Sequence, residues 1–124
     1  MKAKMLLFGF EELPTILAVA KAGTEFGAEV VPVARQDYQQ TLAVLAGEED
    51  AVGTPRPYLG GPLGGRMLVL CGLEGVLEGL LPALRSAGVD NDCMKAVLTE
   101  HNRRWTPIQL FRELQQEHQA LQGR

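Results

Sequence analysis

The sequence predicts a single α/β domain over residues 1–124, built from two strand–helix–strand units. Short apolar runs at residues 5–8, 29–33, 66–71 and 94–98 alternate with segments of helical periodicity. A weak internal repeat relates the halves: Lys4-Met5-Leu6-Leu7 is similar to Arg66-Met67-Leu68-Val69, and Gly9-Phe10-Glu11 to Gly72-Leu73-Glu74. If the repeat is genuine, the domain consists of two βαβ units; the alternative is that any two strand–turn–helix segments share apolar runs and a glycine.

We expect these units to form a ferredoxin-like α/β plait, with an inserted helix and loop and a C-terminal helix. The alternative is a flavodoxin-like doubly wound sheet, in which every helix is a crossover. The plait is preferred because the loop after residue 46 is long and is not committed to either face of the sheet.

In the first unit, Pro14 suits a helix start, and a helix should bury Leu13, Ile16, Leu17 and Ala20. Pro32 lies within the second apolar run. Because proline cannot donate to a sheet ladder, it indicates an edge strand or a bulge.

Residues 36–46 are a second helical candidate, with Tyr38, Leu42 and Leu45 on one face. The Gly/Pro-rich segment that follows, at about residues 47–65, predicts a flexible loop. Its glycines do not form a phosphate loop, because they precede a strand and lack the Lys-Ser or Lys-Thr of that motif.

The second unit should contain a helix that buries Leu77, Leu80, Leu81 and Leu84 and ends at Gly88. After the apolar run at 94–98, Thr106 is placed to cap the last helix and Pro107 to begin it. Residues at helical spacing then form its apolar stripe: Leu110, Phe111, Leu114 and Leu121, with His118 on the same side.

Composition excludes several classes of protein. The net charge of −3 argues against nonspecific nucleic-acid binding. No apolar run approaches the roughly 20 residues needed to cross a membrane, and the N-terminus lacks the apolar region of a signal peptide. Cys71 and Cys93 match no zinc or CxxC spacing, which favours reduced thiols in a cytoplasmic protein.

Several short motifs occur in order along the second half of the chain: Cys71-Gly72, Lys95 to Thr99, Asn102, Trp105-Thr106, Glu113-Leu114 and Glu117-His118. This pattern resembles a small bacterial family known as domain of unknown function 3783. Glu100-His101 departs from the pattern, where proline and a small polar residue are expected. The resemblance is expected to cover nearly the whole chain, and it implies a family without implying an activity.

Polar residues are dense between the last strand and the last helix. A helix N-terminus favours anions, and two adjacent arginines would strengthen that field. The alternative is that the polar side chains only hydrogen-bond the turn's own backbone. The predicted site for a small anionic ligand comprises Lys95, Thr99, His101, Asn102, Arg103, Arg104 and Thr106. In such a site Asn102→Ala should cost little stability, whereas Thr106→Ala should cost about 1 kcal/mol.

Three functional hypotheses remain open. The first is a noncatalytic ligand-binding or regulatory module that works as a homo-oligomer. The second, less favoured, is a small enzyme that uses Lys95 or Cys71 with Thr99 and Asn102. The third is a protein-interaction domain that docks through its C-terminal helix. The sequence assigns no cofactor, and we expect no metal site, because His101 and His118 lack a ligand spacing.

Overall fold

The computed structural model describes residues 2–122, with side chains described for residues 2–119. Four strands and four α-helices make up the described chain, with two short 3₁₀ turns, η1 and η2. In chain order the elements are β1 (Lys4–Phe8), α1 (Leu13–Glu25), β2 (Glu29–Pro32), η1 (Arg35–Asp37), α2 (Leu42–Leu45), β3 (Met67–Cys71), η2 (Glu74–Val76), α3 (Leu77–Ser86), β4 (Met94–Val97) and α4 (Pro107–Gln122).

The four strands form one mixed sheet in the order β2-β1-β3-β4. β1 is parallel to β2, β3 is parallel to β4, and the central pair β1–β3 is antiparallel. The mixed α/β class and the two βαβ units are therefore present. β2 is an edge strand, as Pro32 predicted.

The ferredoxin-like plait is not confirmed. In a plait each βαβ unit is split by a strand of the other unit, whereas here the two strands of each unit are hydrogen-bonded neighbours. The doubly wound alternative is also wrong. A doubly wound sheet would have β1 and β3 parallel, whereas in this protein they are antiparallel. A short parallel crossover can place its second strand directly beside its first, and both units do so.

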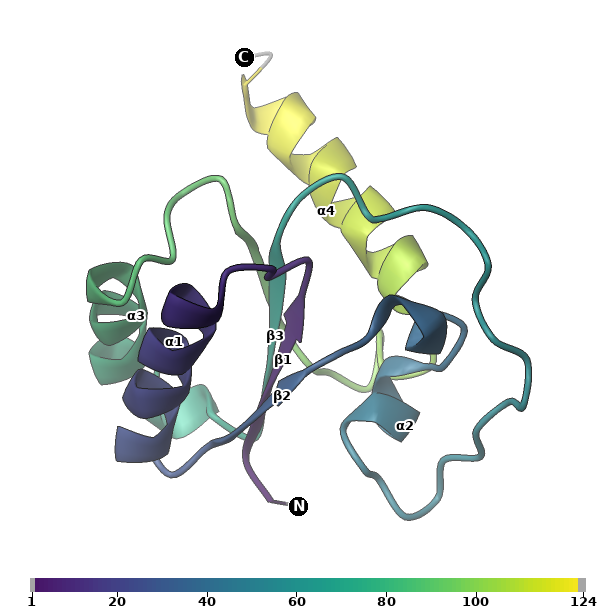
Figure 1. Cartoon of the computed structure of the whole chain (residues 1–124), viewed down its shortest axis with the longest axis horizontal. Coiled ribbons are helices and arrows are strands. Elements are labelled where there is room, and N and C mark those ends of the chain that lie inside the picture. The colour runs from purple at the N-terminus through teal and green to yellow at the C-terminus, as the bar shows by residue number, and fades with distance from the viewer. Residues whose placement is uncertain (1, 123–124) are drawn as a thin grey trace.

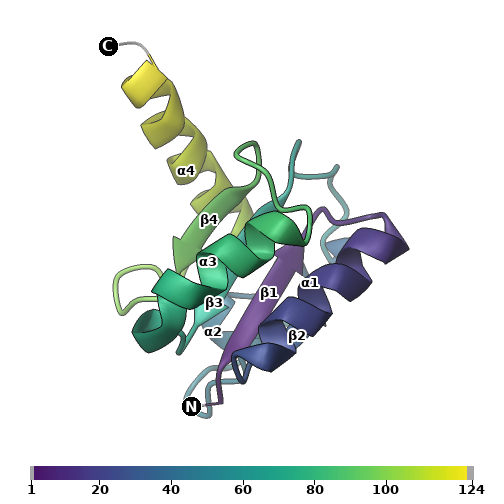
Figure 2. The same ribbon diagram turned by 90° about the vertical axis from the view of Figure 1, so that its left-hand side faces the viewer.

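Helices cover both faces of the sheet, so the protein has three layers (Figure 1). α1 and α3 lie side by side on one face (Figure 2), over a core that includes Met5, Leu7, Leu68 and Leu70. α2, α4 and the long loop cover the other face, over Leu6, Phe8, Met67, Val69 and Cys71. No described helix has the length and apolar character needed to cross a membrane.

The internal repeat is visible in the sheet, but its spacing is one residue longer than the apolar runs suggested. Leu7 and Leu70 face α1 and α3, while Phe8 and Cys71 face the opposite layer. Structurally equivalent positions are therefore 63 residues apart, and Gly9 matches Gly72, both with positive φ. The apolar runs alone suggested a spacing of 62. That spacing would match residues that lie on opposite faces of the sheet.

The buried stripe of α1 differs from the predicted one. Leu13 and Leu17 are 63% and 59% exposed, and the buried residues are Val19, Ala22 and Gly23. The reason is the close approach of α1 to the sheet: a Cβ on Gly23 would lie 2.8 Å from the Val30 side chain. A small residue is therefore needed at Gly23, while Val19 is fully buried and Ile16 packs against the same core.

The predicted helix over residues 36–46 is divided into η1 and α2. Thr41 has an extended backbone, and its Oγ1 accepts a hydrogen bond from Val44 N (3.3 Å), so it begins a new helix. The expected inward positions Tyr38 and Leu42 are nevertheless both buried.

Gly9 and Gly72 allow a matched test of this architecture. Both have φ near +70° to +77°, but a Cβ on Gly9 would lie 2.5 Å from Gly65 O, whereas the nearest atom at Gly72 is 3.6 Å away. Gly72→Ala should cost about 1–2 kcal/mol through backbone strain alone. Gly9→Ala should cost more, because the strain and the backbone clash add. Urea denaturation of the two variants measures the difference, and equal losses would contradict it.

Candidate functional site

Asn102 closes the turn between β4 and α4 on itself. Its Oδ1 accepts a hydrogen bond from Thr99 N (2.9 Å), and its Nδ2 donates to Val97 O (3.0 Å). Thr99 Oγ1 in turn accepts from Asn102 N (3.2 Å). Asn102 is 8% exposed. The expectation that it is a surface group of little structural value is therefore wrong, because its amide satisfies the backbone of the turn.

The same turn holds the start of α2. The carbonyl oxygens of Trp105 and Arg103 accept hydrogen bonds from Leu42 N (2.9 Å) and Ala43 N (2.8 Å). A helix of four residues is too short to persist alone, since helix nucleation is unfavourable. α2 is therefore positioned by the C-terminal turn.

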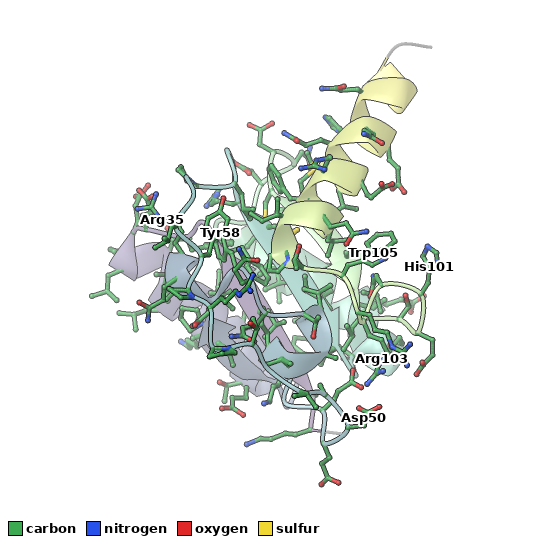
Figure 3. All side chains as sticks on the ribbon, turned by 90° about the vertical axis from the view of Figure 1, so that its right-hand side faces the viewer. Arg35, Asp50, Tyr58, His101, Arg103 and Trp105 are labelled. Atoms are coloured by element: carbon green, nitrogen blue, oxygen red, sulfur yellow. The ribbon has the colours of Figure 1, made fainter. Side chains whose placement is uncertain are left out.

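Arg103 joins the turn to the segment after α2. Its Nε and Nη2 donate to Glu48 Oε2 (2.9 and 2.5 Å), and Nη2 also donates to Asp50 Oδ1 (2.5 Å). The side chains of Arg103 and Glu48 are 8% and 14% exposed, while that of Asp50 is 69% exposed. We call these three residues the Arg103 clasp; Figure 3 shows Asp50 reaching Arg103 from a different segment. The hydrogen bond with Glu48, followed by that with Asp50, raises the pKa of the guanidinium against the opposing effect of desolvation.

Lys95 lies apart from this turn. Its Nζ donates to Asp90 O and Cys93 O, both at 3.1 Å, near the start of β4. By strand alternation it faces the α3 side of the sheet, whereas Arg103 is on the α2 side. The two cations that we expected to converge are therefore separated.

The other predicted residues lie near the turn's surface. His101 is exposed, and its ring meets the Trp105 ring edge-on at 5.0 Å (Figure 3). Arg104 is also exposed. Thr106 caps α4, with its Oγ1 accepting from Gln109 N (3.3 Å). Because Pro107 has no N–H and the cap occupies that of Gln109, this helix start keeps few donors for an anion.

Residues of the Arg103 clasp line two cavities. A cavity of about 290 Å³ is lined by Thr41, Ala43, Asp50, Ala51, Val52, Arg103 and Arg104. A second, of about 590 Å³, is lined by Lys2, Lys4, Glu29, Ala46, Gly47, Glu48, Glu49 and Asp50. Asp50 lines both. Sequence reasoning missed Glu48 and Asp50, although the acidic run at 48–50 and the adjacent arginines at 103–104 were available as complementary charges.

The cysteines are poorly suited to act as nucleophiles. Cys71 is fully buried in β3, and burial raises the pKa of its thiol to about 12. Burial likewise raises the pKa of Cys93 to about 11. Nucleophilic cysteines instead have a lowered pKa and some solvent access. Among the described residues there is also no group of three or more His, Cys, Asp or Glu side chains that could hold a metal ion.

The structure reverses the expected order of the stability losses caused by two substitutions. Asn102→Ala should cost about 2 kcal/mol, because it leaves Thr99 N and Val97 O without their partner. Thr106→Ala should cost about 1 kcal/mol through loss of the cap. Denaturant unfolding provides the measurement, with Asn91→Ala in an exposed turn as the control. A loss for Asn102→Ala no greater than the control would show that the turn does not need this amide.

Both thiols should resist modification in the folded protein. At pH 8 dithionitrobenzoate should react with Cys71 and Cys93 only after denaturant unfolds the chain. Their folded pKa values of about 12 and 11 exceed the unfolded value of about 8.5. The unfolded state therefore loses its thiol protons first, and stability should fall as pH rises from about 8.5 towards 11. Rapid reaction of either thiol under native conditions would contradict the burial argument.

The second half of the chain resembles a known family. Residues 66–121 match the model described as Domain of unknown function (DUF3783). This match begins at the edge of β3 and extends into α4, so the expected coverage of nearly the whole chain is not confirmed. Comparisons with curated proteins and with solved structures found no match. The resemblance to this family therefore covers β3, α3, β4, the Asn102 turn and α4, and it supplies no activity.

Proposed function

We propose that the protein is a noncatalytic ligand-binding module that holds a small anion beside Arg103 and Arg104. One observation supports this proposal above all: the two arginines line the same cavity, together with Thr41. Guanidinium groups bind carboxylates and phosphates through paired hydrogen bonds. A cavity with two of them is therefore suited to an anionic group.

The two arginines differ in their present partners. Arg103 is held by Glu48, which is largely buried, and by Asp50, which is largely exposed. The Arg104 side chain makes no hydrogen bond or ion pair with another described residue. An entering anion would meet Arg104 freely and would compete with Asp50, the more exposed carboxylate, for Arg103.

Displacement of Asp50 from Arg103 by an anion would loosen the segment that follows α2. Farther along, this loop is held by Gln40, whose side chain makes two hydrogen bonds with the backbone of Thr54 (2.7 and 3.0 Å). Tyr58 N also donates to Gln36 O (2.9 Å). Release of Asp50 would therefore free residues 49–53 while leaving the rest of the loop attached. Such a local change at a ligand site is what a regulatory module requires.

The enzyme hypothesis has less support. Cys71 is sealed in the core, and Lys95 is exposed and bound to backbone carbonyl groups. Neither is placed in a cleft beside an acid or base, which a catalytic group needs.

The binding proposal predicts opposite effects for two substitutions. Arg104→Gln should weaken phosphate or citrate binding about tenfold or more, because a charge-assisted contact is lost. Asp50→Asn should strengthen the binding, because it removes the competing carboxylate. Titration followed by ¹H–¹⁵N NMR measures both, and hydrogen exchange at Ala51 should accelerate when anion binds. Arg85→Gln, an exposed residue of α3, is the control. Equal affinities of all three variants and the parent would refute the site.

A further inference from the structure

We propose a second binding site, in the 590 Å³ cavity beside β1 and α2, for a small zwitterion that carries one carboxylate and one ammonium group. This site is distinct from the anion site, because Arg103 and Arg104 do not line it, although Asp50 lines both cavities. Its volume is within the range of small-molecule pockets. Six of its eight lining residues are charged, which points to a polar ligand.

Lys4 supplies the first half of the argument. Lys4 is two residues before Leu6 and four before Phe8 in β1, so all three side chains lie on the α2 side of the sheet. Lys4 is half-buried there. Lys2, Arg66 and Arg103 each have a carboxylate partner. The side-chain ammonium of Lys4, in contrast, makes no hydrogen bond or ion pair with any residue from 2 to 119. A partly desolvated ammonium without a counter-ion is unfavourable, so an anionic ligand group would be stabilised there.

Gly47 leaves the room that this ammonium occupies. A Cβ on Gly47 would lie 2.7 Å from Lys4 Nζ. The residue also has φ +77° and ends α2, with Gly47 N donating to Val44 O and Glu48 N to Ala43 O, each at 3.0 Å. This C-cap turns the chain so that Glu48 reaches Arg103, while the next residue, Glu49, lines the cavity.

Among the other charged residues of the cavity, all except Glu49 form an ion pair with a described residue. Lys2 pairs with Glu29 (3.4 Å), and Glu48 and Asp50 share Arg103. Glu49 has no ion pair with a residue in the described part of the chain. The unmatched groups are thus one cation, Lys4, and one anion, Glu49. A ligand with a single charge would satisfy one and leave the other unmatched, whereas a zwitterion satisfies both.

The test uses matched compounds that differ only in charge. The ¹⁵N-labelled full chain is titrated with 6-aminohexanoate, 4-aminobutyrate and glycine, and separately with hexanoate and hexylamine. At least one zwitterion should bind tenfold or more tightly than either singly charged compound, and it should shift the amides of residues 47–50. Comparison of the three zwitterions reports the separation of the two charges that the site prefers.

Three variants link that binding to the proposed residues. Lys4→Met should reduce zwitterion affinity to about that of hexylamine, and Glu49→Gln should reduce it to about that of hexanoate. Lys21→Met, on exposed α1, should change nothing. Because Glu49 is exposed, its variant is expected to fold even if Lys4→Met does not.

Two outcomes would overturn the proposal: singly charged compounds binding as tightly as every zwitterion, or unchanged zwitterion binding by Glu49→Gln. Absence of binding by all five compounds at about 10 mM, well above a millimolar Kd, would also overturn it. Arg104→Gln should leave zwitterion binding intact, so failure of this site can be distinguished from failure of the anion site.

Discussion

The ion pair between Arg103 and Glu48 joins the chain after α2 to the turn between β4 and α4. The chain between β2 and β3 contributes no strand to the sheet, and its one α-helix has four residues. It covers Leu6 and Phe8 because the C-terminal turn binds it through two backbone hydrogen bonds and through Arg103. Glu48 is largely buried, so removing its partner would leave an uncompensated carboxylate in the core of the contact. Two segments 55 residues apart thus become one layer.

Local chemistry predicted those parts of the fold that local chemistry determines. The four strands, the Thr106 cap, the start of α4 and the edge position of β2 follow from apolar runs, a capping residue and one proline. The order of the strands does not follow, because split and unsplit βαβ units have the same pattern along the chain. The buried stripe of α1 was missed for a related reason. Hydrophobic size favours Leu13 and Leu17, but α1 buries Val19, Ala22 and Gly23, and its close approach to Val30 at Gly23 is a tertiary property.

The candidate site shows the same limit more sharply. Asn102 and Thr99 are the residue types expected both in a ligand-facing turn and in a turn that satisfies its own backbone. Their hydrogen bonds decide for the second, and no feature of the sequence could have decided it. Arg103 was singled out correctly as a notable charge, but its partners are in a segment that looked like an uncommitted acidic loop. Only the folded chain shows that the two charges meet.

Asp50 gives the two proposed sites a physical connection. Its carboxylate lines both cavities and is the exposed partner of Arg103. An anion that displaces Asp50 from Arg103 would leave the Asp50 carboxylate without its cation. The larger cavity, which Asp50 also lines, already contains the unpaired carboxylate of Glu49. The ammonium end of a zwitterion would then find a stronger field, so the first ligand would favour the second. Binding free energies are linked, and the zwitterion would raise the affinity for the anion by the same factor. In the two proposed sites, the exposed carboxylate of Asp50, held by an arginine that Glu48 keeps in place, would couple the binding of the two ligands.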